Sequence, residues 1–226
     1  QAVTLTDDSV TISAIAILAQ QIDRADLAQQ TFVHQMELAD KQAILLNEAI
    51  ETAMFTYAAT SVTTNFDNAS IGGVAGNITV SESNIDGIIR GMKREIREAN
   101  GENVMNRNGA FIVWRPADFE KLEAYVQAQG FSTADGALKN GTNQGFTYMG
   151  VEHYSSNKTT SGHLFGGVKK LLTLGICKST YGQVVVDQEP ATSGGALSAV
   201  AVVMRVDYQF VAWINDRTVL FDILVA

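Results

Sequence analysis

The sequence contains a single cysteine, Cys177, and only two prolines among its 226 residues. One cysteine forms no intramolecular disulfide, so stability must come from packing, from a metal or from association between copies. No apolar run approaches the roughly 20 residues that a membrane span requires, and the first residues do not resemble a signal peptide. These absences exclude a disulfide-rich scaffold and predict a soluble protein.

Basic residues are also scarce: 16 lysines and arginines stand against 24 acidic residues, which gives a net charge of -8. This balance opposes sequence-independent binding to a phosphate backbone, so any contact with nucleic acid would be local. Hydrophobic residues make up 46% of the chain and charged residues 18%, a composition typical of folded proteins. The length predicts one large domain or two closely connected lobes.

Motifs for catalysis and for cofactor binding are absent. The histidines are His34, His153 and His163, none with the spacing of a zinc site. There is no G-x-S-x-G turn, the glycine-rich stretches lack both phosphate-binding spacings, and no carboxylate stands in an apolar stretch. Ser161 and His163 are neighbours without a third orienting group, and Cys177 is most simply a small buried hydrophobe. The sequence therefore predicts no catalytic residue, no metal site and no cofactor.

Two helices are indicated by apolar residues at helical spacing. Residues 26–57 contain no glycine and no proline, and Asp23 or Asp26 is the candidate N-cap of a long helix. A second helix follows Ser83 or Asn84 and ends at Gly101. Its apolar face consists of Ile85, Ile88, Ile89, Met92 and Ile96.

The remaining segments alternate between strands, turns and one further helix, which makes the expected fold class α+β. Residues 2–15 are expected to form an extended arm of two short strands, and residues 61–81 a loop with a short strand at 78–80. A buried strand at 110–114 precedes a helix that begins at Pro116 and ends at Gly130. We expect further strands at 148–154, 183–186, 197–213 and 218–225, a turn at Asn215-Asp216, and a short helix or turn at 166–174.

One sector of the second helix is basic and consists of Arg90, Lys93, Arg94 and Arg97. Two pairs within it are like charges four residues apart, so this face is predicted not to neutralise itself and to require an external anion. The simplest reading is a solvated face. Carboxylates of a neighbouring subunit come second, and nucleic acid comes third because the rest of the protein is acidic.

Several segments, in this order, resemble those of one protein family. They are Val10-Thr11-Ile12-Ser13, residues 22–30 leading into a long helix with Leu46-Asn47-Glu48-Ala49-Ile50-Glu51, residues 84–89, residues 111–122, the strand Tyr148 to Asn157 with its G-x-x-V/H-x-S-N pattern, and the last strands at 203–208 and 218–221. Each pattern is degenerate, and their order is similar to that of the major capsid proteins of tailed bacteriophages.

The resemblance implies the Hong Kong 97-type shell fold. Residues 1–23 would form an E-loop and its connection, residues 24–82 and 200–226 a P-domain with the long spine helix, and residues 83–199 an A-domain. The first lysine is Lys41, inside the spine helix, so a cross-link from an E-loop lysine is not expected. The arm that clasps neighbours in the family is absent or very short, and Gln1 would follow a cleaved scaffolding segment or an arm not included in the sequence.

The resemblance also implies a structural role and not an enzymatic one. Copies would assemble, as hexamers and pentamers, into the icosahedral shell of a virion that encloses double-stranded DNA, in the host cytoplasm and without a membrane or a cofactor. Portal, scaffold and decoration proteins are the implied partners, and contact with DNA would be weak. Arg90, Lys93, Arg94 and Arg97 would contact neighbouring subunits. An encapsulin-type compartment shell and a cytosolic small-molecule enzyme remain the alternatives.

Overall fold

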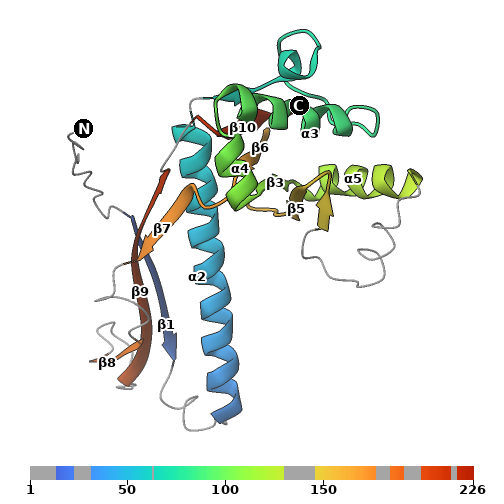
Figure 1. The fold of residues 1–226 in the computed structure, drawn as a ribbon. Helices are drawn as coiled ribbons and strands as arrows, with labels where there is room; N and C mark the ends of the chain where they lie inside the picture. Colours follow the sequence, from blue (N-terminus) through green and yellow to red (C-terminus); the bar gives the residue numbers. More distant parts are fainter. Residues whose placement is uncertain are drawn as a thin grey trace, which may run out of the picture. The chain divides into compact units, whose positions relative to one another are not determined.

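The computed structural model describes residues 14–22, 32–62, 64–129, 146–176, 184–190, 200–214 and 218–226 (Figure 1). The chain divides into two compact units that are interleaved along the sequence. The first comprises the described parts of Gln1–Glu51 and Leu174–Trp213, and the second those of Thr52–Thr173 and Ile214–Ala226. In the described ranges no helix is both long enough and apolar enough to cross a membrane.

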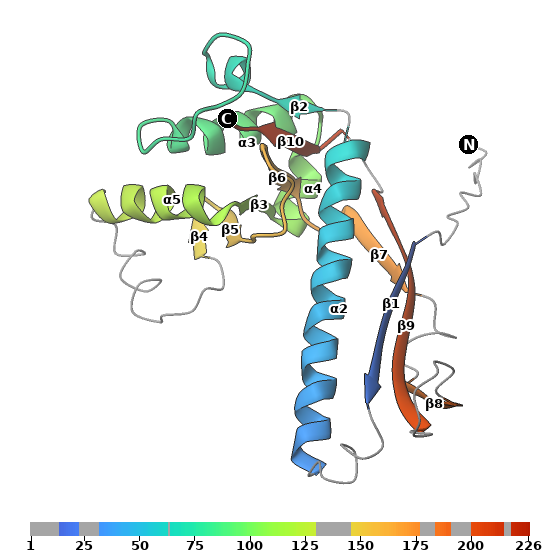
Figure 2. The ribbon, with the colours of Figure 1, turned by 180° about the vertical axis from the view of Figure 1, so that it is seen from behind.

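The first unit contains a sheet built around one long strand, β9 (Val200–Ile214). Strand β1 (Ala14–Ile22) pairs with it antiparallel, with Ala14 opposite Phe210 and Ile22 opposite Val202. β8 (Val184–Pro190) also pairs antiparallel with β9, and β7 (Leu172–Ile176) lies next to it in the strand order. β1 and β9 run side by side in both Figure 1 and Figure 2. The strands predicted at 183–186 and 197–213 are therefore confirmed in type, with shifted ends.

The long helix predicted from the absence of glycine and proline is confirmed as α2 (Phe32–Ser61). Within the first unit, one face of it buries Gln42, Leu46 and Ile50, which recur every four residues and so share a side of the helix. Within the second unit, Ala58 near the end of α2 packs with the buried side chains of Val62, Phe165 and Leu220.

The second unit is organised on a mixed six-stranded sheet with the order β2-β10-β6-β3-β5-β4. The pairs β2–β10 and β3–β5 are parallel and the other pairs are antiparallel, which confirms the α+β class. The strands are β2 (Asn65–Phe66), β3 (Ala110–Trp114), β4 (Phe146–Tyr148), β5 (Val151–Ser155), β6 (His163–Val168) and β10 (Leu220–Leu224).

Four helical segments accompany this sheet: η1 (Asn68–Ile71), α3 (Ile85–Glu98), α4 (Glu102–Asn108) and α5 (Pro116–Ala128). The predicted apolar face of α3 is confirmed, because Ile85, Ile88, Ile89, Met92 and Ile96 are all fully buried. Pro116 begins α5, as expected for a residue whose missing N–H needs no partner there. The sequence did not predict α4, which follows α3 directly.

The glycine-containing segments differ from their predictions. The strand expected at 148–154 is two strands joined at Met149 and Gly150, which have φ values of 54° and 75°. The helix or turn expected at 166–174 is wrong, because Gly166 and Gly167 lie inside β6. A Cβ on Gly166 would lie 2.9 Å from Met92 Sδ, and one on Gly167 would lie 2.4 Å from the carbonyl oxygen of Val219. These glycines serve close packing and not chain reversal.

Several predictions concern residues outside the described ranges. They are most of the N-terminal arm, the caps Asp23 and Asp26, the helix end at Gly130, Cys177 and the turn at Asn215-Asp216. The division into E-loop, P-domain and A-domain stays a prediction.

Candidate assembly surface

Each of the three arginines in the predicted basic sector of α3 has a carboxylate partner within the chain. Arg90 Nη2 lies 2.5 Å from Asp86 Oδ2, and Arg97 Nε lies 3.6 Å from Glu102 Oε1 of α4. Arg94 is 3.0 Å from Glu95 and 3.6 Å from Glu98. The prediction that this face cannot neutralise itself is wrong, because it weighed the like-charge pairs and left out the acidic residues one turn away. The arginine side chains are 54–68% exposed.

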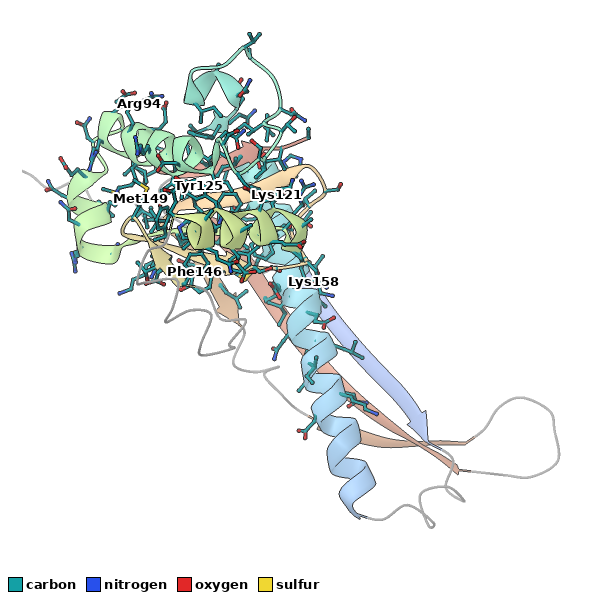
Figure 3. The ribbon with its side chains drawn as sticks, turned by 90° about the vertical axis from the view of Figure 1, so that its right-hand side faces the viewer. Arg94, Lys121, Tyr125, Phe146, Met149 and Lys158 are labelled. Atoms are coloured by element: carbon teal, nitrogen blue, oxygen red, sulfur yellow. The ribbon has the colours of Figure 1, made fainter. Side chains whose placement is uncertain are left out.

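Lys93, the fourth residue of the sector, points to a different partner. Its Nζ donates a hydrogen bond of 2.7 Å to the carbonyl oxygen of Met149. Met149 forms the tight turn between β4 and β5, so Lys93 fastens this hairpin to α3. In the view of Figure 3, Arg94 lies above α3 and Met149 below it. The structure therefore divides the predicted sector into three exposed arginines and one inward lysine.

Arg94 also holds the segment 67–77, here called the α3 loop. Its Nη2 donates a hydrogen bond of 2.8 Å to the carbonyl oxygen of Ser70. The loop approaches α3 at Gly91, where a Cβ would lie 2.8 Å from Phe66 Cζ and 3.2 Å from the Ser70 oxygen. A side chain at position 91 would push the loop away, so the glycine provides the flat helix surface on which η1 lies.

The α3 loop is closed by its own hydrogen bonds. Asp67 caps η1 by accepting a bond of 3.2 Å from the Ser70 N–H. The Asn68 N–H donates to the Gly76 oxygen, and the Gly73 N–H donates to the Asn68 oxygen, each at 2.9 Å. Asn68 Nδ2 donates to the Val74 oxygen at 3.0 Å. The result is a fixed loop whose tip carries Val74, a side chain that is 83% exposed.

A buried carboxylate that sequence reasoning missed lies in β10. Asp222 stands between Phe221 and Ile223 and is 3% exposed, which contradicts the statement that no carboxylate stands in an apolar stretch. His163 Nδ1 lies 2.8 Å from both of its oxygens. Burial raises the pKa of Asp222, and the hydrogen bond from His163 opposes that rise. The apolar flanks of Asp222 were the available signal, but its partner lies far away in the sequence.

The His163–Asp222 pair borders a small cavity next to α2. The other lining residues are Phe55, Ala59, Thr159, Thr160, Leu164 and Phe165. The carboxylate orients the imidazole, which joins β6 to β10 by a side-chain bond in addition to their backbone pairing. Among the residues that the structure describes, no group of three or more His, Cys, Asp or Glu is arranged to hold a metal ion.

A second buried carboxylate fastens the start of α5. Asp118 is 2% exposed and accepts bonds of 2.8 Å from Arg115 Nε and 3.1 Å from Lys121 Nζ. Lys121 also donates to the Val80 oxygen at 3.0 Å, which links α5 to the segment before α3. Both cationic partners are therefore occupied by structural contacts.

A scan against protein-family models finds no match for this chain, and a search of curated proteins finds no relative. Solved structures do match it. A structure described as Mycobacterium phage Che8 has a TM-score of 0.60 at 13% identity, and covers 97% of this chain and 76% of its own. The capsid of Ralstonia phage GP4 has a TM-score of 0.61 at 11% identity, with 94% of this chain and 73% of its own covered.

A virus-like particle from Pyrococcus furiosus matches as well, with a TM-score of 0.55 at 11% identity over 93% of this chain and 75% of that one. These likenesses extend over nearly the whole chain. The fold is the Hong Kong 97-type shell fold found in tailed-phage capsids, and the predicted fold is confirmed.

Proposed function

We propose that this chain is a major capsid protein whose copies assemble, through hexamers and pentamers, into an icosahedral shell enclosing the double-stranded DNA of a tailed bacteriophage. The observation that carries the proposal is the extent of the shell fold. The likeness to the Ralstonia phage GP4 capsid takes in 94% of the chain, so little of the chain is left over for a separate function. Fold alone does not define function, and assembly is therefore the property to test.

The residues assign a mechanical role to the chain. Residues 1–23 would reach a neighbour as the E-loop, residues 24–82 and 200–226 would form the P-domain, and residues 83–199 the A-domain. Arg90, Arg94 and Arg97 would exchange their carboxylate partners for those of an adjacent copy, since all three are more than half exposed. Lys93 would support the surface from within. Many such contacts, each weak, hold a shell together through multivalency.

The proposed role requires neither catalysis nor a cofactor. A net charge of -8 makes contact with packaged DNA weak and non-specific, so that the genome can be packed and released. Portal, scaffold and decoration proteins would be the further partners in a virion that assembles in the host cytoplasm.

Electron microscopy of the particles tests the proposal. The chain is expressed with its native upstream sequence, and the high-molecular-weight fraction is imaged by negative staining. We expect closed shells or capsomer rings. A chain that stays monomeric even when its upstream sequence and a scaffold are supplied would overturn the proposal and favour an enzyme.

The contents of native particles decide between two kinds of shell. The likeness to a virus-like particle keeps an encapsulin-type protein compartment as the second candidate. Particles that protect DNA from nuclease support the capsid, whereas particles filled with one protein support the compartment.

A further inference from the structure

The tip of the α3 loop combines exposure with order. Val74 is 83% exposed, whereas Ile71 in the same loop packs against the hydrophobic core. A single exposed valine is common on protein surfaces and means little by itself. Here, however, the backbone on both sides of Val74 is held by the hydrogen bonds of Asn68 and Gly73. Figure 1 and Figure 2 show this loop projecting beyond α3.

The loop is also fastened to the body of its own unit. Arg94 bonds the Ser70 oxygen, and Phe66 before the loop is buried in the core. A segment that is already ordered loses little conformational entropy when it binds, so its few apolar atoms count almost fully toward affinity. An exposed loop without a partner gains nothing from such order.

We propose that the α3 loop is a preformed apolar knob that contacts a second copy of this chain through Val74. This inference rests on the proposed function, which surrounds every copy with others of the same sequence. The knob lies next to Arg94, and the exposed arginines of α3 with their carboxylates form a charged rim close to an apolar centre. An apolar centre with a polar rim is the usual composition of protein interfaces.

Charge supports a second copy as the occupant. The rim presents Arg90, Arg94 and Arg97 at more than half exposure, while the chain carries eight more acidic than basic residues. Another copy therefore offers an excess of carboxylates to this rim. A nucleic acid would also be attracted to the arginines, but it would leave the valine without an apolar partner.

Substitutions at the tip test the inference. Val74→Thr keeps the shape and replaces a methyl with a hydroxyl, and Val74→Asp adds a charge. The control is Ala69→Asp, which places the same charge at an exposed position in η1. Assembly of the full chain is measured by sedimentation over a concentration series, and thermal unfolding of the unassembled subunit checks the fold.

We expect Val74→Thr to raise the subunit concentration required for assembly about tenfold and Val74→Asp to raise it further, because each contact loses a buried apolar group. Ala69→Asp should stay within a factor of two of the wild type, and all four proteins should unfold at the same temperature. Assembly of Val74→Asp at wild-type concentrations overturns the knob while leaving the capsid proposal intact.

A second measurement decides the inference independently of particle formation. A photo-reactive benzoylphenylalanine replaces Val74, and the concentrated chain is irradiated. A two-chain adduct whose cross-link maps to position 74 supports the knob. If the wild type forms no particles, the capsid proposal fails, and the knob then stands or falls by this adduct: its absence overturns the inference.

Discussion

Trp114 donates its indole N–H to Nδ1 of His153 over 3.0 Å, and both side chains are fully buried. Because Nδ1 accepts this bond, the proton of the neutral imidazole resides on Nε2, which donates to the Tyr148 oxygen at 3.3 Å. The rings of Phe146 and Tyr148 lie beside the imidazole. This arrangement joins β3, β4 and β5 and leaves no room for a charged histidine.

Stability should therefore fall in mild acid. Burial lowers the pKa of His153 from 6.5 to about 4. As the pH falls below 6.5 the unfolded chain binds a proton that the folded chain takes up only near pH 4, so the stabilisation present above pH 6.5 is lost between these values. The difference corresponds to about 3 kcal/mol. Urea unfolding at pH 7 and pH 4.5 measures it. The loss should be smaller in His153→Gln, and an equal loss in both proteins contradicts the prediction.

The two glycines of α3 should respond in opposite directions to alanine. A Cβ at Gly91 meets Phe66 Cζ at 2.8 Å, whereas one at Gly87 has its nearest neighbour, Ile71 Cβ, at 4.0 Å. We expect Gly91→Ala to reduce the free energy of unfolding by about 1–3 kcal/mol through overpacking. Gly87→Ala should raise it by up to about 1 kcal/mol, because alanine favours the helix. Chemical denaturation checks both, and equal effects would show that the loop does not rest on Gly91.

Arg94→Gln should loosen the α3 loop without unfolding the protein. The variant loses the bond to the Ser70 oxygen and two exposed ion pairs, which together contribute about 1–2 kcal/mol. Hydrogen exchange at the amides of Asn68 and Gly73 should accelerate, while exchange in α3 stays unchanged. Arg94→Lys, which retains a donor and the charge, should lie between the two. Faster exchange throughout α3 would instead indicate a general loss of stability.

Reversing two charges should separate stability from assembly. Arg94→Glu combined with Arg97→Glu removes exposed pairs that contribute about 0.2–1 kcal/mol each, so the subunit should stay folded. If these arginines meet carboxylates of another copy, the double variant should form few or no particles. Arg107→Glu, an exposed arginine in α4, is the matched control. Equal yields of particles from the double variant and the wild type would remove these arginines from the interface.

Local patterns predicted the elements whose residues decide their own conformation. The spacing of Ile85, Ile88 and Met92 defines one helix face in any context, and Pro116 marks a helix start because its ring fixes φ. The order of the segments identified the shell fold, which the structure confirms.

Tertiary contacts set the limit of the sequence analysis. Gly166 indicated a turn because glycine favours turns, but it lies in a strand where Met92 Sδ leaves no space for a Cβ. Asp222 looked unremarkable because its partner, His163, lies on another strand. The arginines of α3 were predicted to lack partners because the packing of α4 against α3, which brings Glu102 to Arg97, could not be read from helical spacing.

The position of β10 in the sheet has a consequence for synthesis on the ribosome. This strand pairs with both β2 and β6, so the segments on either side of it wait for residues 220–224 to emerge. Pairings this distant in sequence form slowly, and until then β6 has one edge without a partner. A nascent chain therefore cannot complete its second unit early. Subunits would enter assembly as whole, released chains, which keeps half-made copies from joining a growing particle.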